Sequence, residues 1–257
     1  NDFAILYRTN AQSRSFEDAL RKKNISYRVY GGLSFYQRKE IKDVLAYLRL
    51  LINPDDEQAF KRIINFPARG IGQTTLNKIA VEAKNSSVSD YIFIKDLLKS
   101  SEILNNSTKN KLLDFVIMIE SIKNKIEHAD VFDITKEVLK QSGLYNLYKN
   151  DESLEGINRI QNIEELLNGI KDFVENNEKS HASVSSFLQD VALATDQDND
   201  TNDNNKVSLM TVHLAKGLEF PYVYIVGLEE NLFPSAMNLN SRTELEEERR
   251  LFYVALT

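Results

Sequence analysis

The stretch VSLMTVHLAKGLEFPYVYIVGL, residues 207–228, decides the fold, because it contains two short apolar runs joined by a polar connection. Residues 207–212 and 222–228 have the length and the side chains of buried strands. At the other end of the chain, FAILYR at residues 3–8 has the same character, and SYRVYGG at residues 26–32 shows alternation followed by two glycines. We therefore expect strands from both ends of the chain to form one sheet.

The segment between the first two strands, AQSRSFEDALRKKN at residues 11–24, has the spacing of an amphipathic helix. Strand, helix, strand is the order of a parallel βαβ unit. From about residue 40 to residue 193 the apolar patterns are helical instead, as in IKDVLAYLRLL and KNKLLDFVIMIESIKNKI. The simplest architecture is an α/β domain with a parallel sheet, interrupted by a large all-α insertion.

The domain boundaries follow from these patterns. We place the interrupted α/β domain at residues 1–53 and 206–257, and the helical insertion domain at residues 54–195. DQDNDTNDNNK, residues 196–206, has almost no apolar side chains to bury. We therefore expect residues 196–205 to form a flexible polar loop.

Composition excludes several classes of protein. The 257 residues are 42% hydrophobic and 27% charged, which is typical of a globular protein with a core. There is no cysteine, so disulfides and cysteine-ligated zinc are excluded, and we expect a cytoplasmic protein. The 3 histidines are too scattered for a metal-ligand pattern. No apolar run approaches the roughly 20 residues that a membrane helix needs.

The charge distribution leaves room for nucleic acid. A net charge of -6 argues against nonspecific coating of DNA or RNA. Basic residues nevertheless gather between residues 8 and 49, whereas acids collect from residue 152 onward. A local basic patch can still bind a phosphate backbone.

The connection between the two late strands contains a cluster of polar side chains: Thr211, His213, Lys216 and Glu219. In an open parallel sheet, ligands bind beyond the carboxyl ends of the strands, so these residues are candidates for a binding site. The alternative is a plain polar connection. A phosphate-binding loop of the form GxxxxGK[ST] does not occur in the chain.

These residues also resemble a known family. TVHLAKGLEF followed by EEERRLFYVALT is similar to motifs V and VI of superfamily 1 DNA helicases of the UvrD/Rep/PcrA type. ILYRTNAQSR and GGLSFYQRKEIKDVLAYLRLL resemble motif IV and the start of the second RecA-like domain of the same group. The resemblance covers essentially the whole chain, in order. It implies a partial RecA-like domain of the P-loop NTPase type.

The resemblance implies that ATP binds between two RecA-like domains while single-stranded DNA crosses their top. Glu219, in the string that begins with Gly217, would bind the nucleotide ribose, because a carboxylate accepts hydrogen bonds from both sugar hydroxyls. Tyr7 would stack on the base and Arg8 would reach the phosphates. The alternative for these two is a ring packed in the core beside a solvated charge.

Two further groups of residues are expected to contact DNA. The resemblance places Thr211 and His213 on the DNA side, although a surface histidine is the plain alternative. Phe35 offers a ring for base stacking and Arg38 a charge for phosphate, the combination that single-strand binding needs. The alternative is a turn whose aromatic residues, Phe35 and Tyr36, pack into the core, and we expect one of these two rings to do so.

FPARGIGQTTLNKI, residues 66–79, predicts a grip on duplex DNA. Gly70 and Gly72 permit a tight turn, and Ile71 can anchor it between two helices. The helix that begins near Thr74 has free N–H groups that can receive a phosphate. Arg69 adds charge. The resemblance places this turn in the helical insertion, against duplex DNA ahead of the fork. A purely structural turn is the alternative.

The chain is expected to be a piece of a longer protein. It begins with Asn1. Its last residues, Leu245 followed by EEERRLFYVALT, carry Leu245, Phe252 and Leu256 at helical spacing and end without a cap. We interpret its three glutamates as solvated first-turn charges paired with Arg249 and Arg250, and not as a metal site.

In the family, the Walker motifs and the acidic pair that binds Mg2+ precede the equivalent of Asn1, and the arginine of motif VI follows the equivalent of Thr257. We therefore expect ATP and Mg2+ to serve the full-length protein, and this fragment to bind neither and to hydrolyse no ATP. The expected partners are single-stranded and duplex DNA, the missing N-terminal RecA-like domain of the same protein and repair proteins; no membrane is expected. Alternatives are a noncatalytic DNA- or protein-interaction module and a fragment of a helicase-nuclease of the RecB/AddA kind.

Overall fold

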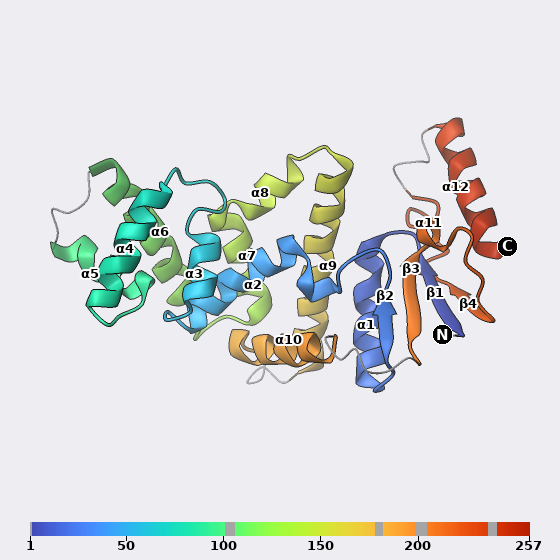
Figure 1. Ribbon diagram of the computed structural model, residues 1–257, viewed down its shortest axis with the longest axis horizontal. Helices are drawn as coiled ribbons and strands as arrows, with labels where there is room; N and C mark the ends of the chain where they lie inside the picture. Colours follow the sequence, from blue (N-terminus) through green and yellow to red (C-terminus); the bar gives the residue numbers. More distant parts are fainter. Residues whose placement is uncertain (1, 101–105, 178–181, 199–204, 236–240) are drawn as a thin grey trace. The chain divides into compact units, whose positions relative to one another are not determined.

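The computed structural model describes residues 2–100, 106–177, 182–198, 205–235 and 241–257, and these form two compact units (Figure 1). The sheet unit consists of Asn1–Arg38 and Val191–Thr257, and the helical unit of Lys39–Asp190. The chain is thus α/β with a helical insertion, as predicted. The dividing points differ from our boundaries at residues 53 and 195, because the helix that starts at Lys39 packs with helices of the helical unit.

The sheet unit follows the predicted order of strands and helices. Its elements are β1 (Phe3–Tyr7), η1 (Asn10–Gln12), α1 (Ser13–Lys22), β2 (Tyr27–Val29), η2 (Phe35–Gln37), β3 (Val207–Thr211), α11 (Val212–Ala215), β4 (Tyr222–Ile225) and α12 (Arg242–Leu256). All strand pairs are parallel, and the strand order is β2-β3-β1-β4. β3, from the late part of the chain, therefore lies between the two early strands.

One face of the sheet is covered by α11 and α12. Alternation along β1 points Ala4 and Leu6 to this face, where they pack in one cluster with Leu251 and Ala255 of α12. The buried stripe of α12 is Glu248, Leu251 and Ala255. Leu245 and Leu256, which recur with Phe252 at the helical spacing noted in the sequence, are 43% and 63% exposed and lie outside this buried stripe.

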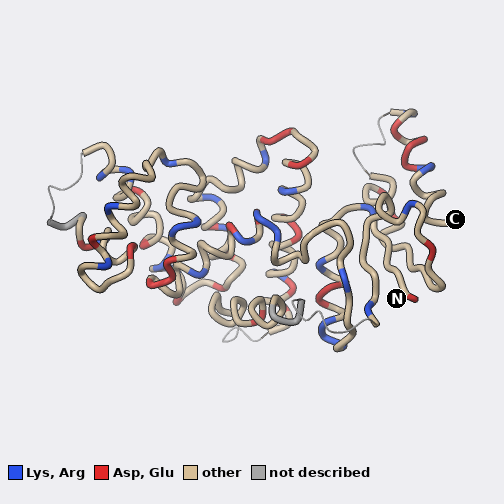
Figure 2. Tube along the Cα trace, in the orientation of Figure 1, with Lys and Arg blue, Asp and Glu red and all other residues tan. Residues whose placement is uncertain are grey.

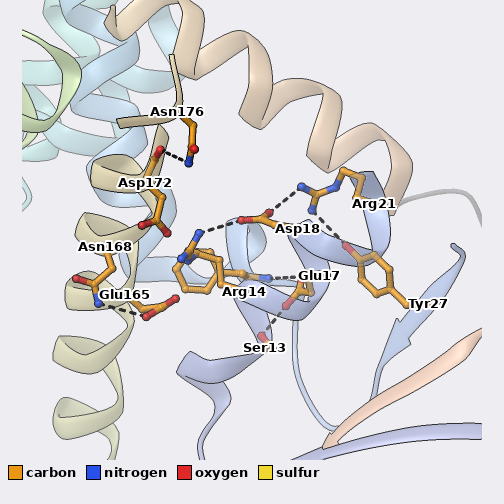
Figure 3. A network of polar contacts seen from close by, with 11 residues as sticks. Ser13, Arg14, Glu17, Asp18, Arg21, Tyr27, Glu165, Asn168, Asp172 and Asn176 are labelled. Carbon is orange, nitrogen blue, oxygen red and sulfur yellow. Dashed lines mark hydrogen bonds and ion pairs between the residues drawn. The ribbon is translucent and has the colours of Figure 1, made fainter. Parts of the chain in front are cut away.

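A buried polar network holds the segment after β2 to α1 (Figure 3 shows the α1 side). The Glu17 carboxylate is 1% exposed and accepts hydrogen bonds from the Ser13 hydroxyl at 2.5 Å and the Phe35 backbone N–H at 3.0 Å. Arg38 donates to the Ser13 hydroxyl at 2.7 Å, and its guanidinium lies 5.0 Å from the centre of the Phe35 ring. On the same helix, Asp18 accepts hydrogen bonds from both Arg14 and Arg21.

The helical unit contains α2 to α10, the last of which runs on past Asp190. Its elements are α2 (Lys39–Ile52), α3 (Glu57–Ile63), α4 (Gln73–Asn85), α5 (Asp90–Ser100), α6 (Asn106–Lys123), α7 (Val131–Ser142), α8 (Leu144–Lys149), α9 (Leu154–Asn176) and α10 (Val184–Asp198). α10 therefore includes the first three residues of the predicted polar loop at 196–205, and residues 199–204 of that loop lie outside the described residues.

A buried carboxylate joins three of these helices. Asp43 of α2 is 2% exposed; its two oxygens accept hydrogen bonds from Arg62 Nε of α3 at 2.7 Å and from the Tyr148 hydroxyl of α8 at 2.9 Å. Burial and the neighbouring Asp43 raise the pKa of Tyr148, so its hydroxyl remains a donor. The partners satisfy a charge that would otherwise be costly to bury.

We predict that Glu17→Ala lowers the free energy of unfolding of the sheet unit by about 3 kcal/mol or more, because it removes the buried acceptor of the Phe35 N–H and the carboxylate that lies 4.0 Å from the Arg38 guanidinium. Urea denaturation followed by circular dichroism measures this. Glu230→Ala, which removes an exposed carboxylate from the same unit, is the matched control. Equal midpoints for the two variants would contradict the structural role of Glu17.

Candidate functional site

The carboxyl ends of β1 and β3 bring together the polar residues predicted from motifs IV and V. Tyr7 is the last residue of β1 and pairs in register with Thr211, the last residue of β3. Arg8 follows directly, and His213 lies in α11, which starts where β3 ends. This edge is where an open parallel sheet binds its ligands.

Arg8 is held by an acid that our sequence analysis treated as solvated. Its Nε donates to the two carboxylate oxygens of Glu248 at 3.0 and 3.1 Å, and its Nη2 donates to Oε1 at 2.6 Å. The side chain of Glu248 is 4% exposed, and that of Arg8 is 18% exposed. The Ser235 backbone N–H adds a contact to Glu248 at 3.3 Å.

The other two glutamates of the acidic run agree with our interpretation. Glu246 pairs with Arg249, and Glu247 pairs with Arg250, on the exposed side of α12. The acidic band near the start of α12 is visible in Figure 2. The helical spacing of Glu248 from Leu251 and Ala255 could have distinguished it from the exposed Glu246 and Glu247. A charged side chain on the buried stripe of a helix requires a partner.

Tyr7 does not offer a ring to a base in this structure. It is fully buried, so the expected stacking on a nucleotide base is corrected: the ring belongs to the core. Burial raises the pKa of Tyr7 well above its usual value, and the Glu17 carboxylate raises it further, so the hydroxyl stays protonated. The physical reason is alternation, since Tyr7 points to the face opposite that of Leu6.

Thr211 and His213 lie at the carboxyl edge as predicted, with His213 exposed and Thr211 half-buried. Partial desolvation lowers the pKa of His213, and the positive charge of Arg8 lowers it further, whereas Glu248 opposes the change. His213 is therefore a neutral imidazole at pH 7, able both to donate and to accept a hydrogen bond.

Gly217 and Glu219 lie in the connection from α11 to β4, and both are exposed. Gly217 has φ 82°, a left-handed conformation that favours glycine. The Glu219 carboxylate is thus open to a ligand from solvent.

Phe35 and Arg38 have structural positions in place of the expected DNA contacts. Phe35 is fully buried and Tyr36 is 7% exposed, so both rings, and not one, are in the core. Arg38 is 8% exposed and is engaged with Ser13 and the Phe35 ring. The aromatic and basic residues of this segment therefore stabilise the loop after β2. The buried Phe35 N–H donates to the Glu17 carboxylate, and the Arg38 guanidinium donates to the Ser13 hydroxyl.

The Arg69 side chain stabilises the glycine-containing turn before α4 by hydrogen bonds within the helical unit. Its Nη1 donates to the backbone carbonyls of Ile63 at 2.8 Å, Ile64 at 3.2 Å and Pro67 at 3.3 Å, and its Nη2 donates to the Tyr47 hydroxyl at 2.7 Å. A guanidinium with this many protein partners is not aimed at a phosphate, so the expected DNA contact of Arg69 is corrected to a structural one.

The outer side of the same turn is open. Gly70, Gly72 and Thr74 are exposed, while Ile71 is 2% exposed and anchors the turn as predicted. Gly70 has φ 65°, and its carbonyl accepts from Lys111 Nζ at 2.9 Å. Gly72 is the N-cap of α4, where the first backbone N–H groups have no intrahelical partner.

Fold and edge together define the class: a partial RecA-like domain with a parallel sheet and a helical insertion. Over residues 1–257 the chain matches the model of the UvrD-like helicase C-terminal domain, and it belongs to this family. It is 42% identical to the ATP-dependent DNA helicase PcrA of Bacillus subtilis over 265 residues. It is 41% identical to proteins of that name from Staphylococcus epidermidis over 261 residues and Staphylococcus aureus over 260.

These comparisons confirm the family that the motifs indicated. They cover 100% of this chain but 35% of each relative, so the chain spans about a third of the length of the relatives it matches. None of the helices in the described residues is long and apolar enough to span a membrane.

We predict that Arg69→Ala lowers the free energy of unfolding of the helical unit by about 2–4 kcal/mol, since it leaves several carbonyls and the Tyr47 hydroxyl without a donor. Differential scanning calorimetry measures this. Lys78→Ala, at an exposed position of α4, removes a positive charge without that loss and is the control. An unchanged melting temperature for Arg69→Ala would contradict the structural role and favour the DNA contact expected from the sequence.

Proposed function

We propose that this chain is part of an ATP-dependent DNA helicase that moves along single-stranded DNA and unwinds duplex DNA in the cytoplasm, in repair or replication. The observation that carries this proposal is the match of the whole chain to the UvrD-like helicase C-terminal domain. The relatives are named as ATP-dependent DNA helicases. Their greater length is compatible with an N-terminal RecA-like domain that supplies the Walker motifs.

The nucleotide half of the proposal involves Arg8, Gly217 and Glu219. Arg8 uses Nε and Nη2 on Glu248, and within the described residues its Nη1 has no hydrogen-bond partner. That edge fits a phosphate oxygen. The exposed Glu219 suits ribose hydroxyls, and Gly217 gives the connection its left-handed turn. When bound, ATP supplies the phosphoryl group whose transfer releases the free energy for movement.

The proposed ATP-dependent activity also requires Mg2+. No cluster of three or more histidine, cysteine, aspartate or glutamate side chains that could hold a metal ion occurs among the residues that the structure describes. We propose that Mg2+ is bound by the nucleotide and by the N-terminal RecA-like domain of the longer protein.

We propose two DNA contacts, one in each unit. At the carboxyl edge of the sheet, Thr211 and the neutral His213 would contact single-stranded DNA by hydrogen bonds or stacking. In the helical unit, the exposed turn formed by Gly70, Gly72 and Thr74 would receive a duplex phosphate at the start of α4. Lys111 beside Gly70 adds positive charge to that turn.

We predict that the purified chain of residues 1–257 hydrolyses no ATP, with or without single-stranded DNA, because its sequence has no Walker A loop. Release of inorganic phosphate measures this, with the longer protein as the positive control. DNA-stimulated turnover that follows the chain through purification would contradict the prediction.

We predict that Gly72→Asp weakens binding of duplex DNA about tenfold at low salt, since it sets a negative charge where a phosphate would bind. A Cβ at Gly72 meets no atom within 4 Å, and aspartate is a good N-cap, so the fold should be unaffected. Gly72→Ser is the matched neutral control. Fluorescence anisotropy at increasing salt measures affinity, and equal affinity for both variants would refute the duplex contact.

A further inference from the structure

We propose that Glu248 and Gln12 are positioning residues that orient Arg8 toward the nucleotide phosphates. This inference rests on the proposed role of Arg8, and it assigns a function to two side chains that are not among the nucleotide-binding residues named above. Glu248 acts on the side chain of Arg8, and Gln12 acts on its backbone.

The position of Glu248 follows from two periodicities. Along β1, alternation points Ala4, Leu6 and then Arg8 to the sheet face that α12 covers. Along α12, Glu248 precedes Leu251 by one turn and lies on the buried stripe. The guanidinium at the end of the strand and the carboxylate on the helix therefore meet where the apolar core ends.

The geometry of this pair selects one orientation of the guanidinium. Nε and Nη2 lie on the same edge of the planar group, and both donate to Glu248, with distances of 3.0 and 2.6 Å to its Oε1. The remaining nitrogen, Nη1, must then point away from Glu248. A bidentate contact of this kind fixes direction as well as distance, which a single point contact does not.

Gln12 fixes the backbone from which Arg8 projects. Its Oε1 accepts the backbone N–H of Arg8 at 3.0 Å and that of Thr9 at 2.9 Å. Its Nε2 lies against Gly227, just beyond β4, where an added Cβ would be 2.2 Å away. The Gln12 side chain therefore joins the chain segments that follow β1 and β4.

A purely structural role explains Glu248 poorly. Leu251 and Ala255, its neighbours on the stripe, are apolar, and an apolar side chain at position 248 would complete that face without a charge to desolvate. An exposed acid would be enough to form an ion pair with an arginine, as Glu246 and Glu247 do with Arg249 and Arg250. A buried bidentate carboxylate is needed where the direction of the guanidinium matters.

The test is a double-mutant cycle in the longer protein, with steady-state ATP hydrolysis and equilibrium binding of a nonhydrolysable ATP analogue as measurements. We expect Arg8→Ala to reduce kcat/KM for ATP about 100-fold. Glu248→Ala should reduce it about tenfold, and Glu248→Gln less. In the Arg8→Ala background, Glu248→Ala should cost less than about twofold, because its target is already absent. Glu247→Ala, at the neighbouring exposed acid, is the control.

A second readout follows the orientation itself without nucleotide. In the chain of residues 1–257, the Arg8 Nε–H should give a protected 15N NMR signal that Glu248→Ala and Gly227→Ala weaken, the latter by displacing Gln12. Normal hydrolysis and analogue binding by Glu248→Ala, with Arg8→Ala impaired, would overturn the positioning role alone. Normal behaviour of Arg8→Ala would overturn the nucleotide role of Arg8, and this inference with it.

Discussion

The parallel ladder that seats β3 between β2 and β1 is the constraint on which the sheet unit depends. Residues Val207–Thr211 pair with both early strands, so neither early strand pairs with the other. Neither end of the chain can complete this sheet alone. The helical insertion must therefore leave after β2 and return into β3, and the carboxyl edge unites motifs that lie about 200 residues apart in the sequence.

Much of this fold is visible in the sequence, because short apolar runs and helical periodicity report burial directly. All four strands, α1 and the anchoring Ile71 lie where the patterns predict them. The strand order is not visible, because a parallel βαβ pattern does not say which strand lies between. The division at Arg38 was also missed, since α2 is helical in sequence and its packing partners lie far along the chain.

The candidate site was predictable in place but less so in detail. Aromatic and basic residues near glycines suit DNA, yet Phe35, Arg38 and Arg69 all bond within their own units. Turns that bury carbonyls and N–H groups need donors and acceptors, and arginine meets that need as well as it meets a phosphate. Composition alone does not distinguish an arginine that binds its own chain from one that binds a phosphate. The positions of Thr211, His213 and Glu219, by contrast, follow from their place at the end of β3 or after it.

Three buried carboxylates follow one rule. Glu17, Asp43 and Glu248 are 1%, 2% and 4% exposed, and each lies on a helix and receives an arginine from outside that helix. Removing either member of such a pair leaves an uncompensated charge, which makes the pairs costly to break and hence rigid. Glu17 holds the segment after β2 to α1, and Asp43 connects α2 with α3 and α8.

The pair of Arg8 with Glu248 differs because it lies at the carboxyl edge of the sheet, beside the histidine whose pKa Arg8 lowers. The same charge thus reaches toward the proposed nucleotide on one side and affects a proposed DNA contact on the other. The bidentate contact with Glu248 restricts the orientations that the Arg8 side chain can adopt at that point. A movement of the Arg8 guanidinium would therefore change the electrostatic field at His213, within the same unit.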